Sequence, residues 1–153
     1  RLAMVGTAYP MRVTPALLDN SLNHPAKAID MVTQFSHSTM APPPSALGPG
    51  TWVPGGGKAL MRRVLASNAN ENIFNIGFKA CDQYDQGEVA MAKVTCPTLF
   101  LLGKKDQMTT PKAAQSLIKL ARDGRVAMVN AGHQLMVEAP EESLSALIAF
   151  CQK

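Results

Sequence analysis

Two apolar runs, each followed within a few residues by a glycine and then by a polar residue, constrain the fold of this chain most. The first run covers Thr98 to Leu102 and leads to Asp106, and the second covers Arg125 to Val129 and leads to His133. A segment long enough for one helix separates them. A strand, a helix and a strand with short connections predict a right-handed parallel crossover. The nearly continuous apolar character of the first run is typical of a parallel strand that is covered on both faces.

Asp106 and His133 both lie just beyond the predicted carboxyl ends of these strands, where functional groups gather in open parallel sheets. An ionised Asp106 that accepts a hydrogen bond from one imidazole nitrogen would fix the tautomer of His133. It would also stabilise the imidazolium that forms when the other nitrogen takes a proton from a nucleophile. The alternative is structural, with Asp106 capping a loop and His133 satisfied beside the sheet. We favour the catalytic pair because both residues stand in matching contexts, and we expect Gly103 and Gly132 to allow tight turns there.

The nucleophile that such a pair would activate is absent from the sequence. No serine, cysteine or aspartate lies in an elbow of the Gly-x-Ser-x-Gly type. The sequence begins inside an apolar run and without an initiating methionine, so we expect it to be cut from a longer chain. We predict that the chain alone is inactive, because an acid and a base without a nucleophile or oxyanion donors have nothing to activate.

Composition excludes several classes of function. With 153 residues, 46% of them apolar, the chain can bury one modest core. The net charge of +4 comes from scattered residues and only 5% of residues are aromatic, so we expect no nucleic-acid partner. No apolar run approaches the roughly 20 residues that span a bilayer, so we expect no membrane insertion.

The cysteines and histidines indicate a reduced, metal-free protein. The three cysteines are odd in number and widely spaced, and none forms a C-x-x-C pair. The start of the chain also lacks the pattern of a signal peptide, so we expect free thiols in the cytoplasm. His24 and His37 have no second ligand at metal spacing. We therefore expect no metal and no cofactor.

The chain divides into three segments by its residue patterns. Residues 1–11 hold a short strand, residues 12–92 read as helices, and residues 93–153 alternate between strand and helix. Prolines and glycines over residues 39–57 predict a long loop, and Trp52 is expected either to anchor this loop or to line a pocket. We predict a helix from Pro111 to about Arg122. A closing helix is expected to start at Pro140, with Leu144, Leu147, Ile148 and Cys151 on one face.

Three stretches resemble parts of the α/β-hydrolase fold. Cys96 to Pro111, with the sequence CPTLFLLGKKDQMTTP, is similar to the seventh strand and acid loop of that family. Ala131 to Glu141, with the sequence AGHQLMVEAPE, resembles its histidine loop and last helix. Leu2 to Gly6 is similar to its sixth strand, which leads into a helical cap. The resemblance implies an α/β fold made of the last three strands of the parallel sheet, with a cap at residues 12–92.

The resemblance also implies roles for single residues. Asp106 would be the acid and His133 the general base of a Ser-Asp-His triad whose nucleophile lies upstream of Arg1. Some family members place the acid after the sixth strand, but residues 6–9 offer none. The cap would shape a substrate pocket, with candidate wall residues at Trp52, Met108, Leu135 and Met136. Core packing is an equally good interpretation of the last three.

The function that follows is hydrolysis of a small ester-like substrate, completed by the N-terminal half of the same protein. The same architecture serves thioesterases, dehalogenases, epoxide hydrolases and C–C bond hydrolases, and an upstream aspartate nucleophile would favour dehalogenation or epoxide opening. A non-catalytic binding protein that uses the cap cleft as a receptor pocket is an alternative from another class. A structural or partner-binding fragment is a third. The acid and histidine pairing disfavours the receptor, since a binder needs no base with a fixed tautomer.

The strand at Leu2 to Val5 would lose its usual neighbour in a chain of this extent and expose an unpaired edge. We therefore predict that the isolated chain self-associates or swaps domains through this edge. Sedimentation at increasing concentration measures it, and a strictly monomeric species at high concentration would contradict the prediction.

Overall fold

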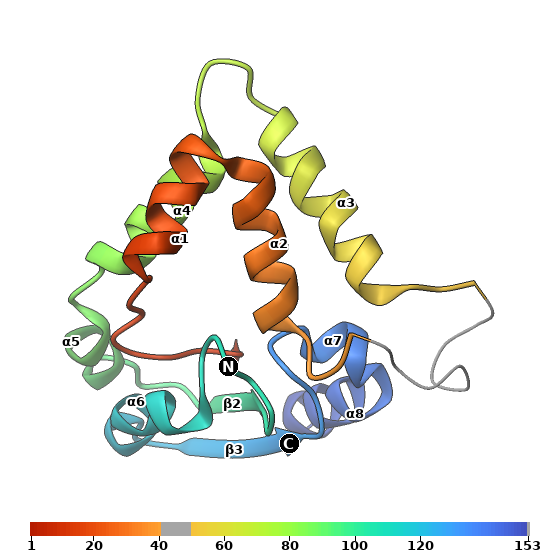
Figure 1. Cartoon of the computed structure of the whole chain (residues 1–153). Helices are drawn as coiled ribbons and strands as arrows, with labels where there is room; N and C mark the ends of the chain where they lie inside the picture. Colours follow the sequence, from red (N-terminus) through yellow and green to blue (C-terminus); the bar gives the residue numbers. More distant parts are fainter. Residues whose placement is uncertain (41–49, 153) are drawn as a thin grey trace.

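The computed structural model describes residues 1–40 and 50–152, which form a three-stranded parallel sheet with helices on both faces (Figure 1). The strands, in their spatial order, are β1 (Leu2–Val5), β2 (Thr98–Gly103) and β3 (Gly124–Val129). Thr98 pairs with Leu2 on one side and with Gly124 on the other. The predicted α/β class with parallel strands is confirmed.

Most of the helices begin where the sequence supplies a proline or a capping side chain. Thr14 accepts a hydrogen bond from the N–H of Leu17 before the first helix, and Thr110 accepts one from Ala113 after β2. In chain order the helices are α1 (Pro15–Asn23), α2 (Pro25–Ser36), α3 (Val53–Ala66), α4 (Ile73–Gln83), α5 (Gly87–Ala92), the 3-10 helix η2 (Pro111–Ala114), α6 (Gln115–Leu120), α7 (Leu135–Glu138) and α8 (Pro140–Cys151). Of these helices, α5, α6 and α7 begin without a proline or a capping side chain.

The core lies on both faces of β2, which is buried along its whole length. Leu99 and Leu101 point to the face covered by α7 and α8, where they pack with Leu135 and Phe150. The alternate residues of β2 point to the other face and pack against α5 and α6. Burial on both faces explains why the strand has almost no polar residues.

Helices α1 to α4 form a layer that arches over the sheet, here called the helical layer (Figure 1). Within it, α1 packs against α2 and α4, and α3 packs against the same two helices. The side-chain amide of Asn75 donates to the Oγ of Ser21 over 2.7 Å and so links α4 to α1. Lys58 and Asp30 form an ion pair at 2.6 Å between α3 and α2. The division of the chain at residues 11 and 92 stays a prediction.

Two expected elements differ in their bounds from the structure. The loop predicted over residues 39–57 ends earlier, because α3 begins at Val53 and accommodates Pro54 in its first turn; residues 41–49 lie outside the described part. The helix predicted from Pro111 divides into η2 and α6, which ends at Leu120.

The apolar face predicted for the closing helix overlaps the packing face at one residue. Leu147 packs against the core, whereas Leu144, Ile148 and Cys151 are exposed, and the remaining contacts of α8 come from Ser143, Ala146 and Phe150. Phe150 fills the core, and Ser143 is accommodated there because its hydroxyl donates to the carbonyl of Leu135 over 3.2 Å.

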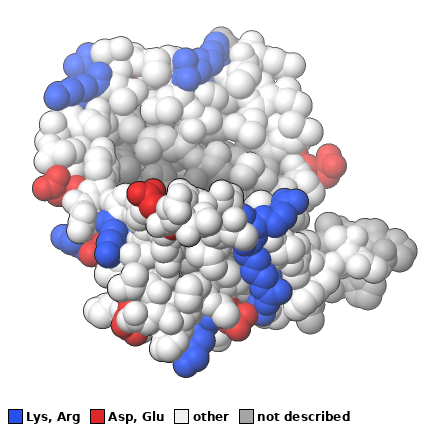
Figure 2. All heavy atoms as spheres, turned by 90° about the horizontal axis from the view of Figure 1, so that it is seen from above, with Lys and Arg blue, Asp and Glu red and all other residues white. Residues whose placement is uncertain are grey.

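Lysine and arginine side chains lie at several separate places on the face that Figure 2 shows, with acidic side chains among them. Over residues 1–40 and 50–152, no helix is long and apolar enough to cross a membrane. The same residues contain no group of three or more histidine, cysteine or acidic side chains placed to hold a metal ion.

Replacing Gly103 by alanine should destabilise the protein, because the added Cβ would lie 2.3 Å from the carbonyl oxygen of Gly132. We expect the free energy of unfolding to fall by roughly 2 kcal/mol or more, measured by denaturant titration. Gly77→Ala is the matched control: a Cβ there meets nothing within 4 Å. The control should be neutral or stabilise α4 by up to about 1 kcal/mol. Equal effects of the two substitutions would contradict the prediction.

Candidate active site

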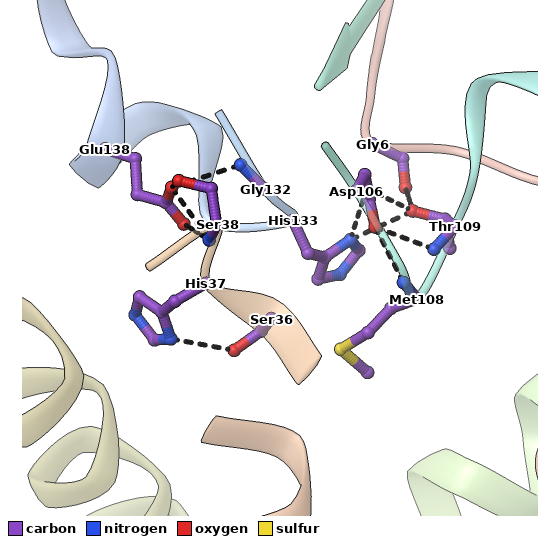
Figure 3. Close-up of polar contacts among 10 residues, drawn as sticks. All are labelled: Gly6, Ser36, His37, Ser38, Asp106, Met108, Thr109, Gly132, His133 and Glu138. Atoms are coloured by element: carbon purple, nitrogen blue, oxygen red, sulfur yellow. Dashed lines mark hydrogen bonds and ion pairs between the residues drawn. The ribbon is translucent and has the colours of Figure 1, made fainter. Parts of the chain in front are cut away.

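The ends of all three strands converge on one cluster of polar groups (Figure 3). Gly6 directly follows β1, Asp106 lies three residues after β2, and His133 lies four residues after β3. Because parallel strands present their carboxyl ends at the same edge of a sheet, these residues meet although they are distant in sequence.

The carboxylate of Asp106 is fully buried and accepts hydrogen bonds on both oxygens. Its Oδ1 accepts the backbone N–H groups of Met108 at 2.8 Å and Thr109 at 2.9 Å. Its Oδ2 lies 2.8 Å from the hydroxyl of Thr109 and 3.0 Å from Nδ1 of His133. A buried charge is tolerated when it is paired and hydrogen-bonded in this way.

These contacts determine the charge of Asp106. Burial raises the pKa of the carboxyl, but the hydrogen bonds from His133 and Thr109, together with the charge that the imidazole can carry, act in the opposite direction. The net result is that the pKa of Asp106 lies below its ordinary value. Asp106 is therefore ionised at neutral pH and accepts hydrogen bonds only.

The imidazole of His133 is oriented by its Nδ1, which lies 3.0 Å from Oδ2 of Asp106 and 2.9 Å from Oγ1 of Thr109. Because an ionised carboxylate can only accept, Nδ1 carries the proton and Nε2 is the basic nitrogen. The side chain is 29% exposed, so the ring is accessible from one side. Gly6, with φ +56°, passes beside it, and a Cβ there would lie 3.4 Å from Nδ1.

The chain turns at Gly103 and bends at Gly132, as expected from the sequence, and the N–H of Asp106 donates to the carbonyl of Gly103 over 3.2 Å. What requires glycine at these positions is close approach. Neither has a positive φ; among the described residues that conformation occurs at Gly6 and Gly50. A Cβ on Gly103 would clash with the backbone of Ala131 and Gly132, in the loop that follows β3. A Cβ on Gly132 would lie 2.7 Å from the backbone nitrogen of Ser38. The two glycines thus bring the loops after β2 and β3 together and seat α2 on the second of them.

Asp106 and His133 are thus brought together, whereas the four predicted wall residues are dispersed. Met108 lies in the acid loop beside the pair (Figure 3). Leu135 is 1% exposed and packs in the core, so its burial favours the packing interpretation. Met136 is 62% exposed. Trp52 is 54% exposed, precedes α3 and donates its indole N–H to the carbonyl of Met40.

Two polar residues of the site were not identified from the sequence. Thr109 lies between the acid and the imidazole, and its hydroxyl also lies 2.7 Å from the carbonyl oxygen of Gly6. Its position three residues after Asp106 is the available signal, since an aspartate often caps the backbone two or three residues ahead. Glu138 accepts hydrogen bonds from Gly132 and Ser38, and no local pattern indicated this role.

Comparison with known proteins gives no match to a family model and none to a curated protein. Solved structures do match. A thermophilic esterase is 22% identical with a TM-score of 0.74, and an esterase from Exiguobacterium antarcticum is 16% identical with a TM-score of 0.78. The enol-lactonase from Burkholderia xenovorans LB400 is 16% identical with a TM-score of 0.74. Each match covers 99% of this chain but only 55–57% of the other chain.

Replacing Asp106 by asparagine should destabilise the protein at neutral pH. Both carboxylate oxygens face donors, so the NH2 group of asparagine would face another donor in either orientation. We expect a loss of about 1–3 kcal/mol in the free energy of unfolding. Since the folded-state pKa of Asp106 is lowered, its contribution is present above the ordinary aspartate range near pH 4 and is lost as pH falls through the folded value. The difference in the free energy of unfolding between the parent and Asp106→Asn should therefore shrink below about pH 4.

Denaturant titrations between pH 7 and pH 3 measure this difference, with the exposed Asp85→Asn as control. The control should change stability by less than about 0.5 kcal/mol at any pH. A difference between the parent and Asp106→Asn that stays constant over the whole range would show that the carboxylate charge is not responsible.

Proposed function

The chain has the α/β-hydrolase fold, of which it spans about half, and from this premise we propose that it supplies the acid and the general base of a Ser-Asp-His triad. The observation that carries the proposal is the 3.0 Å contact between Nδ1 of His133 and Oδ2 of Asp106. This contact leaves Nε2 free to act on a third group. A buried, ionised acid on the far side of an accessible imidazole is the arrangement that a general base requires.

In the proposed reaction, Nε2 of His133 takes the proton of a serine hydroxyl as the serine oxygen attacks the carbonyl carbon of an ester. Asp106 stabilises the imidazolium through the proton on Nδ1. The imidazolium then protonates the leaving alcohol oxygen as the acyl bond to it breaks. In the second half, His133 takes a proton from the water that attacks the acyl carbon. It then returns this proton to the serine oxygen as the bond from that oxygen to the acyl group breaks, which releases the acid and restores the enzyme.

The serine and the oxyanion donors must come from outside this chain, and we propose that a preceding half of the same protein supplies them. Two surfaces support the idea. In the described part, the outer edge of β1 has no paired strand, and an apolar cavity of about 230 Å³ lies against Leu2 and Met4. The apolar residues Leu144 and Ile148 on α8 are also exposed. Both surfaces would be buried if the sheet and its covering helices continued.

The helical layer is proposed to act as the cap over this site, and the substrate is proposed to be a small ester-like molecule handled in the cytoplasm. Figure 1 supports the first idea, because α1 to α4 stand over the sheet. Met108, beside the acid and base, is the best placed of the predicted wall residues (Figure 3).

The test is labelling of the full gene product by a fluorophosphonate, which reacts with an activated serine. We expect the parent to label and His133→Ala to label roughly a thousandfold more slowly or not at all, because the serine loses its base. His24→Ala is the matched control: His24 is exposed at the break between α1 and α2 and should leave labelling unchanged.

No labelling of a folded parent protein would reject the serine mechanism and favour an aspartate nucleophile or a binding protein. Equal labelling of the parent and His133→Ala would reject His133 as the base.

A further inference from the structure

The C-terminal end of α2 rests on the loop that carries His133. The backbone N–H of Gln134 donates to the carbonyl of Ser36 over 3.0 Å. Gly132, on the other side of His133 in the sequence, packs closely against the same carbonyl group. A Cβ added to Gly132 would lie 2.9 Å from the carbonyl oxygen of Ser36. The helical layer therefore touches both sequence neighbours of His133.

A single carboxylate, that of Glu138, joins the two segments at this place (Figure 3). Its Oε1 and Oε2 each lie 3.0 Å from the backbone nitrogen of Ser38, and the Ser38 hydroxyl also donates to Oε2. Oε2 accepts in addition the N–H of Gly132 over 3.1 Å. Glu138 thus accepts hydrogen bonds from Gly132, which directly precedes His133, and from Ser38, which follows α2 and lies 100 positions from Glu138 in the sequence.

The place of Glu138 in the fold makes this link short and stiff. It ends α7, and its own N–H donates to the carbonyl of Gln134 over 2.9 Å. The loop from Gly132 to Glu138 is therefore closed at both ends, with His133 inside it. Since the loop and α2 share these bonds, a shift of the helical layer at Ser38 is transmitted to the backbone of His133.

We propose that Glu138 is a positioning residue that couples the helical layer to the catalytic histidine, so that seating of the layer holds the imidazole in line with Asp106. The role in catalysis rests on the proposed function. Glu138 lies outside the acid and base pair, and it acts through the backbone of Gly132.

Glutamine is the informative substitution, because it keeps the shape of the side chain and removes one acceptor. Both carboxylate oxygens face N–H or O–H donors, so the amide NH2 meets a donor in either orientation. Glu142→Gln is the matched control, since Glu142 is exposed in the first turn of α8.

The experiment compares Glu138→Gln with the parent in the full gene product. Ester hydrolysis rates are referred to active sites titrated with the fluorophosphonate, so that a loss of folded protein does not lower them. We expect kcat to fall about tenfold or more while KM changes by less than about twofold, because misplacement of a reacting group lowers the rate without weakening substrate contacts. Glu142→Gln should keep the parent values.

Proton NMR of the Nδ1–H of His133 provides a readout that does not depend on activity. The resonance is assigned by its loss in His133→Ala. We expect it to shift or broaden in Glu138→Gln and to be unchanged in Glu142→Gln, because it reports the bond to Asp106.

Parent kcat together with an unshifted resonance in Glu138→Gln would overturn the proposal. If that variant does not fold, Ser38→Ala, which removes one donor to Oε2, takes its place: a shifted resonance supports the proposal and an unshifted one overturns it. If the parent neither labels nor hydrolyses esters, the proposed function fails, and the resonance alone decides whether Glu138 positions His133.

Discussion

The burial of the Asp106 carboxylate is the constraint on which the rest of the site depends. A charge without solvent must be matched by donors, and here two backbone N–H groups, the Thr109 hydroxyl and the His133 imidazole provide them. The donors come from the loops after β2 and β3, so they are available only when these strands pair in register. The hydrogen bonds that make the buried charge tolerable also orient the imidazole. The same contacts therefore stabilise this edge of the sheet and fix the geometry of the acid and histidine pair.

A second layer of contacts joins this edge to the helices above it. Close approach at Gly103 brings the two loops together, and close approach at Gly132 lets the end of α2 lie directly on the histidine loop. Glu138 then satisfies backbone donors of both segments. The helical layer and the sheet are thereby connected beside the imidazole of His133.

Local pattern predicted the elements well where burial was uniform and poorly where it depended on a neighbour. The apolar run at β2 indicated a strand covered on both faces, and the structure confirms it. For α8, the spacing of large apolar residues indicated Leu147 correctly but not the buried Ser143, whose hydroxyl donates to the carbonyl of Leu135, a contact that the spacing cannot show. The start of α3 was missed because prolines and glycines indicate a loop, although Pro54 is compatible with a first helical turn.

The sequence by itself determined that an acid and a histidine follow two parallel strands, and this was enough to predict that they meet. The reason is general, since parallel strands end at the same edge whatever their side chains. Only the tertiary structure decided that Thr109 lies against both residues and that Glu138 bonds Ser38. Both outcomes depend on the directions of single side chains in space, and the contact of Glu138 with Ser38 joins positions 100 residues apart. Hydrogen bonds of this kind have no periodicity in the sequence, because the fold brings their partners together.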